Sequence, residues 1–218
     1  MLYTLIVIMA AGLLPAALFY EKKENRKGLL PAKTSLSLLF VLSALIQPPA
    51  AVGTYRLFLL AGLVLCLLGD VCLVFRQKKM FLAGLVSFLL GHVFYILAFF
   101  QVTRFGMTSC LGAVVIFLAG AGIYIWLRPH LGAMRPAVFF YSAVISAMLS
   151  AAWSVWSDSG LEATGRWMIF GGALCFYISD IFVARDRFLK KDFFNRLLGL
   201  PLYYSGQFLL AFSAGFLR

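Results

Sequence analysis

Charged residues are scarce in this chain. Lys, Arg, Asp and Glu make up 12% of its 218 residues, about half the share that is usual in soluble domains. Hydrophobic residues make up 63%, and the mean hydropathy is +0.96. No stretch between the apolar segments is long enough to fold as a soluble domain. We therefore expect a single transmembrane domain over residues 1–218, with any chemistry inside the helical bundle or at its surface.

Histidine and cysteine are also rare. The chain has two histidines, which makes a histidine-rich metal site implausible. Its four cysteines, Cys66, Cys72, Cys110 and Cys175, lie in apolar runs without metal or disulfide spacing. We expect buried free thiols, and we predict neither a metal nor another cofactor.

Acidic residues are fewer than basic ones, at 8 against 19, which gives a net charge of +11. A basic balance can indicate a nucleic-acid partner, but here the basic residues lie in short loops between apolar segments. The positive-inside rule explains that placement better. We therefore predict no nucleic-acid partner and expect contact with membrane lipids, while the oligomeric state stays open.

Eight apolar segments have the length of about 20 residues that a membrane-spanning helix needs. Met1 opens directly into the first segment without a positively charged region, so we interpret that segment as a transmembrane helix rather than a cleaved signal peptide. The predicted fold is all-α, a polytopic membrane helix bundle of eight transmembrane helices. The segments are 1–20, 33–50, 56–75, 80–101, 107–127, 135–156, 166–184 and 197–217.

Basic residues are distributed unevenly between the two sides of the predicted membrane topology. The loops after the first, third, fifth and seventh segments hold fifteen of them, and the other side holds four. This asymmetry places the fifteen in the cytoplasm and both termini outside, in the cell (cytoplasmic) membrane. The fifteen are Lys22, Lys23, Arg26, Lys27, Lys33, Arg76, Lys78, Lys79, Arg128, Arg135, Arg185, Arg187, Lys190, Lys191 and Arg196.

Two acids, Asp70 and Asp180, lie deep in apolar sequence. An ionisable residue at such a position costs about 2.5–3.5 kcal/mol on insertion scales and usually marks a functional site. Asp70 precedes Arg76 by six residues and Asp180 precedes Arg185 by five. At 1.5 Å per residue, both carboxyls lie roughly 8–9 Å from the cytoplasmic boundary. We expect them at matching depth on helices of the same direction, where they can face one cavity.

Further polar side chains fall on neighbouring predicted helices, at a similar depth or nearer the middle of the membrane. Each has an alternative role in helix packing or at the membrane interface. The candidates for substrate binding or support are His92, Tyr95, Tyr141, Tyr203, Tyr204 and Gln207. Two basic residues near the acids, Lys79 and Arg185, are candidates for binding a phosphate head group, although membrane topology alone is the favoured explanation for them.

A faint repeat relates residues 56–101 to residues 166–217. Each half has an acid-bearing segment, a basic loop and a segment with a polar face that ends in an Ala-Phe pair. The first half also carries a stripe of small residues, Gly84, Ser87 and Gly91, which we interpret as a helix-packing face.

Five motifs in order resemble the YhhN-like lysoplasmalogenase family over about two thirds of the chain. The motifs are GDVCL at 69–73, FLAGLVSFLLGHVFYILAF at 81–99, RPAVFFYSAVISAM at 135–148, GALCFYISDIFVARDRF at 172–188 and LYYSGQFLL at 202–210. The resemblance implies an eight-helix membrane hydrolase that cleaves the vinyl ether bond of lysoplasmalogens. The products would be a fatty aldehyde and glycerophosphoethanolamine or glycerophosphocholine. The two characteristic acids of the family fall on Asp70 and Asp180.

Vinyl ether hydrolysis needs a proton donor for the β-carbon and an anion that stabilises the resulting cation or activates water. Two carboxyl groups, one protonated and one ionised, meet this need, as they do in glycosidases, and we expect the pair to hold one proton between them. Three other readings use the same acids. An intramembrane aspartyl protease is disfavoured because Leu67 stands where its G-x-G-D motif needs glycine. A proton-coupled transporter or lipid-binding membrane protein is the main alternative, and a purely structural role for each Asp is the third.

Overall fold

The computed structural model describes residues 2–48, 53–75, 77–104 and 106–217, and within these ranges all regular structure is helical. Eight long helices follow one another, as the sequence predicts, with short helical turns η1 (Arg128–His130) and η2 (Gly132–Met134) between the fifth and sixth. The long helices are α1 (Leu2–Lys22), α2 (Arg26–Leu45), α3 (Gly53–Val74), α4 (Lys78–Phe99), α5 (Met107–Leu127), α6 (Arg135–Ser157), α7 (Ala163–Ala184) and α8 (Phe193–Ser213).

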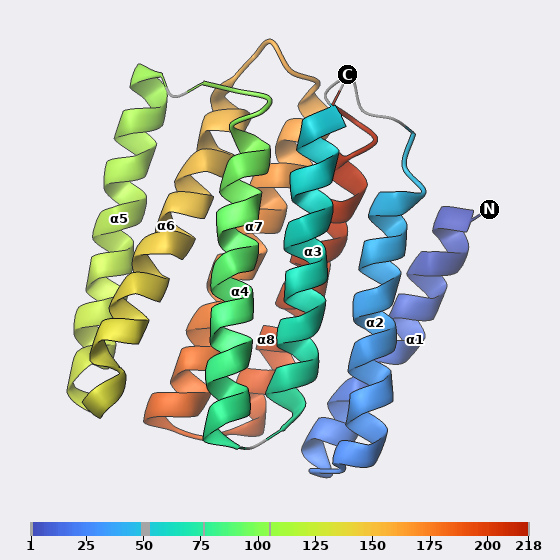
Figure 1. Cartoon of the computed structure of the whole chain (residues 1–218), viewed down its shortest axis with the longest axis vertical. Helices are drawn as coiled ribbons and strands as arrows, with labels where there is room; N and C mark the ends of the chain where they lie inside the picture. The colour runs from blue at the N-terminus through green and yellow to red at the C-terminus, as the bar shows by residue number, and fades with distance from the viewer. Residues whose placement is uncertain (1, 49–52, 76, 105, 218) are drawn as a thin grey trace.

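The helices run alternately up and down the bundle, so that α1 begins and α8 ends at the same end (Figure 1). Helices α1 and α5 lie at opposite edges, whereas α8 lies between these edges and contacts α7, α2, α1 and α3. Helices α3 and α7 point in the same direction, which the matching depth of Asp70 and Asp180 requires. A turn of π-helix, η3 (Arg185–Leu189), continues α7 toward α8.

Seven of the eight long helices in the described chain are long and apolar enough to cross a membrane, which makes this a multi-pass membrane protein. The exception is α8, which has 21 residues but buries Asn195, Tyr203, Tyr204 and Gln207. The face of a helix that packs on other helices can carry polar groups because these groups find partners in protein rather than facing lipid. The predicted number of helices is thus confirmed, while the eighth is more polar than a lipid-facing span.

Two helices begin earlier than the sequence predicts because polar side chains cap them. Asn25 accepts a hydrogen bond from Gly28 N at 3.2 Å, and α2 starts at Arg26 instead of residue 33. Lys33 therefore lies inside α2 and is buried, so its assignment to a loop was wrong. Asp192 caps α8 in the same way, which places Arg196 in the helix. The predicted end of the second segment, at residue 50, lies outside the described residues.

The four cysteines are free, but only one of them is fully buried. Cys66 is enclosed by α3 and its neighbours, while Cys72 and Cys175 are partly buried and Cys110 is exposed. Cys110 lies on α5, the edge helix, whose outer face packs against no other helix (Figure 1). The prediction of buried thiols was therefore wrong for Cys110.

Glycines let two helix pairs approach closely in equivalent ways. A Cβ on Gly62 of α3 would lie 3.1 Å from the carbonyl oxygen of Gly91 in α4. A Cβ on Gly206 of α8 would lie 2.7 Å from the carbonyl oxygen of Gly172 in α7. The α3–α4 and α7–α8 pairs thus share one kind of glycine contact, which is common between membrane helices.

The same register relates these contacts to the two acids. Asp70 follows Gly62 by eight residues, and Asp180 follows Gly172 by eight. The two carboxyls therefore lie at corresponding positions relative to the glycine contact of their own helix pair. The faint repeat has a structural counterpart, and the stripe that contains Gly91 packs on α3 as predicted.

Candidate active site

A cavity of about 110 Å³ is bordered by both Asp70 and Asp180. Each of the helices α2 to α8 contributes at least one residue to its lining, as does η3. The cavity therefore lies among these seven helices. Apart from the two acids and a few hydroxyl, amide and basic groups, its lining is apolar, with Leu85, Phe88 and Ile123 among the contributors. An apolar cavity with a few converging polar groups is the usual form of a small-molecule site. We name it the acid cavity.

Asp70 is held by three donors. Ser37 and Tyr203 each donate a hydroxyl hydrogen bond to its Oδ2 at 2.7 Å, and Lys33 Nζ lies 3.1 Å from its Oδ1. The Asp70 side chain is 2% exposed and the Lys33 side chain 5%. Three donors on two oxygens require an acceptor, so this environment suits the carboxylate form. Because both charges are buried, each depends on the other for compensation.

Asp180 has a different environment, with its side chain 18% exposed. Tyr141 donates a hydrogen bond to its Oδ2 at 2.5 Å, and His92 Nε2 lies 3.5 Å from the same oxygen. No described residue donates to its other oxygen, Oδ1. Asp180 thus has a carboxyl oxygen that is not engaged by the protein, on a residue that borders the acid cavity.

The tautomer of His92 can be assigned from its partners. His92 Nε2 lies 3.1 Å from the Tyr141 hydroxyl, which already donates to Asp180 and can therefore accept from an Nε2–H group. His92 Nδ1 is buried without a hydrogen-bond partner in the described chain. A neutral ring with its proton on Nε2 leaves only a lone pair unpaired there, whereas an imidazolium would bury an unpaired N–H. We therefore assign the neutral form, which orients Tyr141 toward Asp180.

Each carboxyl group has its own partners. The described residues include no hydrogen bond that joins Asp70 to Asp180, and a proton held between the two acids stays a prediction. Within the described ranges, no group of three or more His, Cys, Asp or Glu side chains could hold a metal ion.

The remaining predicted residues fall into two groups. Tyr141 and Tyr203 border the acid cavity, and His92 lies directly behind Tyr141. Tyr95 and Gln207 instead bond to each other at 2.6 Å across α4 and α8, away from the cavity lining. Tyr204 is buried against the ring of Tyr203 and does not line the cavity either. A supporting role for these three stays a prediction.

Lys79 and Arg185, the predicted head-group residues, do not line the acid cavity. Three other basic residues do, namely Lys33, Arg187 and Arg196. Lys33 and Ser37 are the two partners of Asp70 that sequence reasoning missed. Their spacing of four residues puts them on one helix face, a signal that becomes visible only if α2 is taken to start before Lys33.

A profile of the YhhN family matches residues 30–214, which includes every residue that contacts Asp70 or Asp180 in the preceding paragraphs. The chain belongs to the YhhN family.

Three relatives in this family carry the name lysoplasmalogenase. The chain is 32% identical to lysoplasmalogenase TMEM86A of Bos taurus over 160 residues, which cover 70% of this chain and 63% of the relative. It is 32% identical to TMEM86B of Mus musculus over 169 residues, 75% of this chain and 66% of the relative. It is 34% identical to TMEM86A of Homo sapiens over 163 residues, 70% and 63% of the two chains. The match thus spans just under two thirds of each relative's length. No solved structure matches the chain.

Proposed function

We propose that this protein hydrolyses the vinyl ether bond of lysoplasmalogens, giving a fatty aldehyde and a glycerophospho-alcohol. The observation that carries the proposal is the pair of acids: Asp70 and Asp180 border one apolar cavity in unlike environments. Paired carboxyls whose surroundings favour different protonation states are the usual basis of acid–base work on ether and acetal carbons. The names of the relatives support the substrate class.

Asp180 is the proposed general acid. Its Oδ2 is held by Tyr141, while its Oδ1 is not engaged by a described residue and can carry the proton. Transfer of that proton to the β-carbon of the vinyl ether converts the double bond into an oxocarbenium ion. Tyr141, oriented by neutral His92, fixes the carboxyl during the transfer.

Asp70 is the proposed anion. Its carboxylate stabilises the oxocarbenium ion through space while Lys33 and the hydroxyls of Ser37 and Tyr203 hold it in place. Water then adds to the cationic carbon, and the proton that it loses restores the acid on Asp180. The resulting hemiacetal transfers its hydroxyl proton to the glycerol oxygen as the carbon–oxygen bond breaks. One water is consumed, and aldehyde and alcohol are released.

The first test is to incubate the purified protein with 1-alkenyl-lysophosphatidylethanolamine and to measure aldehyde. We expect aldehyde from the alkenyl lipid and none from the 1-alkyl analogue, because protonation requires the carbon–carbon double bond. Faster cleavage of the 1-acyl lysolipid would contradict the mechanism and indicate an ordinary lysophospholipase. Movement of intact alkenyl lipid across vesicles without aldehyde would favour the transporter alternative.

Substitution of the acids tests their roles. Asp70→Asn and Asp180→Asn should each lower kcat by about two orders of magnitude or more. The double variant should be scarcely slower than either, because groups that act as one unit are not additive. Activity against pH should fall on both sides of an optimum in the unchanged protein, and each single variant should lose one side. The control is Asp158→Asn at the opposite end of the bundle, where Asp158 bonds Thr103 and Gly160. Near-normal turnover in a folded Asp180→Asn variant would remove Asp180 from the mechanism.

A further inference from the structure

A second cavity, of about 630 Å³, adjoins the acid cavity at the end of the bundle where α1 joins α2 and α7 joins α8. We name it the polar cavity. The two share a boundary, because the same five residues line both: Leu73, Phe81, Val183, Arg187 and Arg196. A molecule that extends out of the acid cavity past this boundary enters the polar cavity.

Charged side chains of both signs line the polar cavity in nearly equal number. They are five basic residues, Lys22, Arg26, Arg187, Lys191 and Arg196, and four acidic residues, Glu21, Glu24, Asp186 and Asp192. Such a lining has little net charge but can offer a cation to one part of a ligand and an anion to another. A ligand that carries both signs therefore matches this lining better than a purely anionic one.

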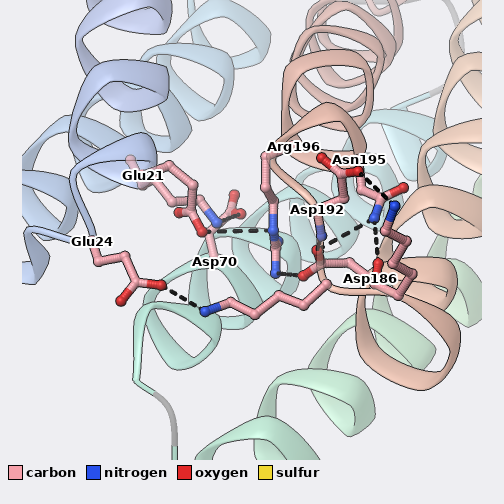
Figure 2. A network of polar contacts seen from close by, with 10 residues as sticks. Glu21, Glu24, Asp70, Asp186, Asp192, Asn195 and Arg196 are labelled. Carbon is pink, nitrogen blue, oxygen red and sulfur yellow. Dashed lines mark hydrogen bonds and ion pairs between the residues drawn. The ribbon is translucent and has the colours of Figure 1, made fainter.

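Several of these charges hold the protein together rather than facing a ligand. Arg196 lies between Glu21 of α1 and Asp186 of η3, at 3.6 Å and 2.8 Å (Figure 2). Asp186 also accepts from the backbone N–H of Asp192 and from the side chain of Asn195. These bonds fix the segment between α7 and α8 against the start of α8, and with it the position of Arg187.

Of the basic residues that line the polar cavity outside this network, Arg187 is the one that also borders the acid cavity. Its guanidinium lies 4.2 Å from the centre of the Phe81 ring, and no carboxylate among the described residues pairs with it. The aromatic contact holds the planar group while its five N–H donors stay available. A guanidinium with free donors binds a phosphate oxygen pair in bidentate fashion.

The acidic residues supply the other sign. The backbone N–H of Phe194 hydrogen-bonds the carboxylate of Asp192 and holds the pKa of Asp192 below its ordinary value, so this residue is an anion at neutral pH. Glu24, which also lines the polar cavity, pairs with Lys191 at 2.6 Å (Figure 2). An ammonium group in the polar cavity would share these carboxylates with the basic residues that already pair with them.

We propose that the polar cavity binds the zwitterionic phosphodiester head group of a single-chain ether lipid, with Arg187 on the phosphate and the acidic residues around the ammonium. This inference rests on the proposed function, since it places the alkenyl ether beside Asp70 and Asp180. Arg187 follows Asp180 by seven residues, which corresponds to about 10 Å along a helix. A separation of that size accommodates the glycerol unit that joins an ether oxygen to the phosphate.

Binding of an uncleavable ligand tests the proposal without relying on catalysis. The probe is 1-alkyl-lysophosphatidylethanolamine, whose affinity for the protein in nanodiscs is compared with that of a 1-alkylglycerol, which lacks phosphate. We expect the phosphate-bearing lipid to bind at least about tenfold more tightly, as one charge-assisted bidentate contact allows. Arg187→Gln should abolish most of that difference, and Arg187→Lys should restore part of it.

The matched control is Arg128→Gln, which removes a guanidinium from the same end of the bundle but from neither cavity. It should keep the full preference for the phosphate-bearing lipid. If folded Arg187→Gln also keeps it, the proposal is overturned. Equal affinity for glycerophosphoethanolamine and the lysolipid would overturn the lipid assignment in favour of a soluble phosphodiester. Binding of the alkyl lipid through Arg187 without aldehyde from the alkenyl lipid would instead retain this site and refute the hydrolase.

Discussion

At the scale of single residues, the two acids differ because of what surrounds them. Their depth was predictable, because the spacing to the next basic residue gives it. The ion pair of Lys33 with Asp70 was not, because the helix start that brings Lys33 into the bundle depends on the Asn25 cap. Lys33 was counted as a loop residue that marks the cytoplasmic side. In the structure it is buried, and its ammonium compensates the charge of Asp70.

The ion pair gives a prediction that separates folding from catalysis. Lys33→Met leaves a buried carboxylate without its cation and should lower the free energy of unfolding by about 3–5 kcal/mol. The double variant Lys33→Met/Asp70→Asn removes both charges and should recover most of that stability without recovering activity. Thermal unfolding in detergent and aldehyde release provide the two measurements.

Lys27→Met is the control for this pair, since Lys27 is an exposed basic residue on the same helix. Lys27→Met should change neither the free energy of unfolding nor the release of aldehyde. A Lys33→Met variant that is as stable as the unchanged protein would show that the ion pair contributes nothing to folding. In that case the account of Asp70 as an anion held by Lys33 would also fail.

At the scale of helices, rotation about the helix axis decided which polar residues meet the acid cavity. Tyr203, Tyr204 and Gln207 all lie on α8, yet Tyr203 faces Asp70 while Gln207 bonds Tyr95 in the core. Sequence spacing shows that residues share a face, but not toward which neighbour that face turns. For this reason the set of polar residues was predictable, whereas their division between cavity and core was not.

The close approach of α7 and α8 predicts a specific sensitivity. A Cβ at position 206 would lie 2.7 Å from the backbone oxygen of Gly172, and backbone cannot move aside as a flexible side chain can. Gly206→Ala should therefore force the helices apart and lower the free energy of unfolding by about 1–3 kcal/mol or more. We expect a lower Tm and, because Asp180 lies on α7, a lower kcat as well.

Gly122→Ala is the matched control, since nothing lies within 4 Å of a Cβ at this position on α5. Alanine favours helix over glycine by about 1 kcal/mol in soluble helices, so this variant should be as stable as the unchanged protein or slightly more so. Equal Tm values for the two variants would contradict the role of the α7–α8 glycine contact.

At the scale of the whole molecule, both cavities are lined by residues from the end of the bundle that carries most of the basic loops. Lys33 lies in the bundle interior, so fourteen of the fifteen basic residues assigned to that side from the sequence still count toward it. The asymmetry survives the correction, because four basic residues still stand on the other side. Hydropathy and charge alone thus predicted three features of the fold. They are the number of helices, the shared direction of α3 and α7, and the position of both acids near one end of the bundle.

This arrangement predicts the side of the membrane from which substrate enters. By the positive-inside rule, we expect the end with the polar cavity to face the cytoplasm. A reporter in the loop between Arg185 and Arg196 should read as cytoplasmic, and one fused after Arg218 as external. In right-side-out vesicles, lysoplasmalogen confined to the outer leaflet should be cleaved only as fast as it crosses to the inner leaflet. Inside-out vesicles should cleave added lipid at once. Immediate cleavage in right-side-out vesicles, or reporter signals opposite to these, would reverse the orientation and place the polar cavity in the outer leaflet.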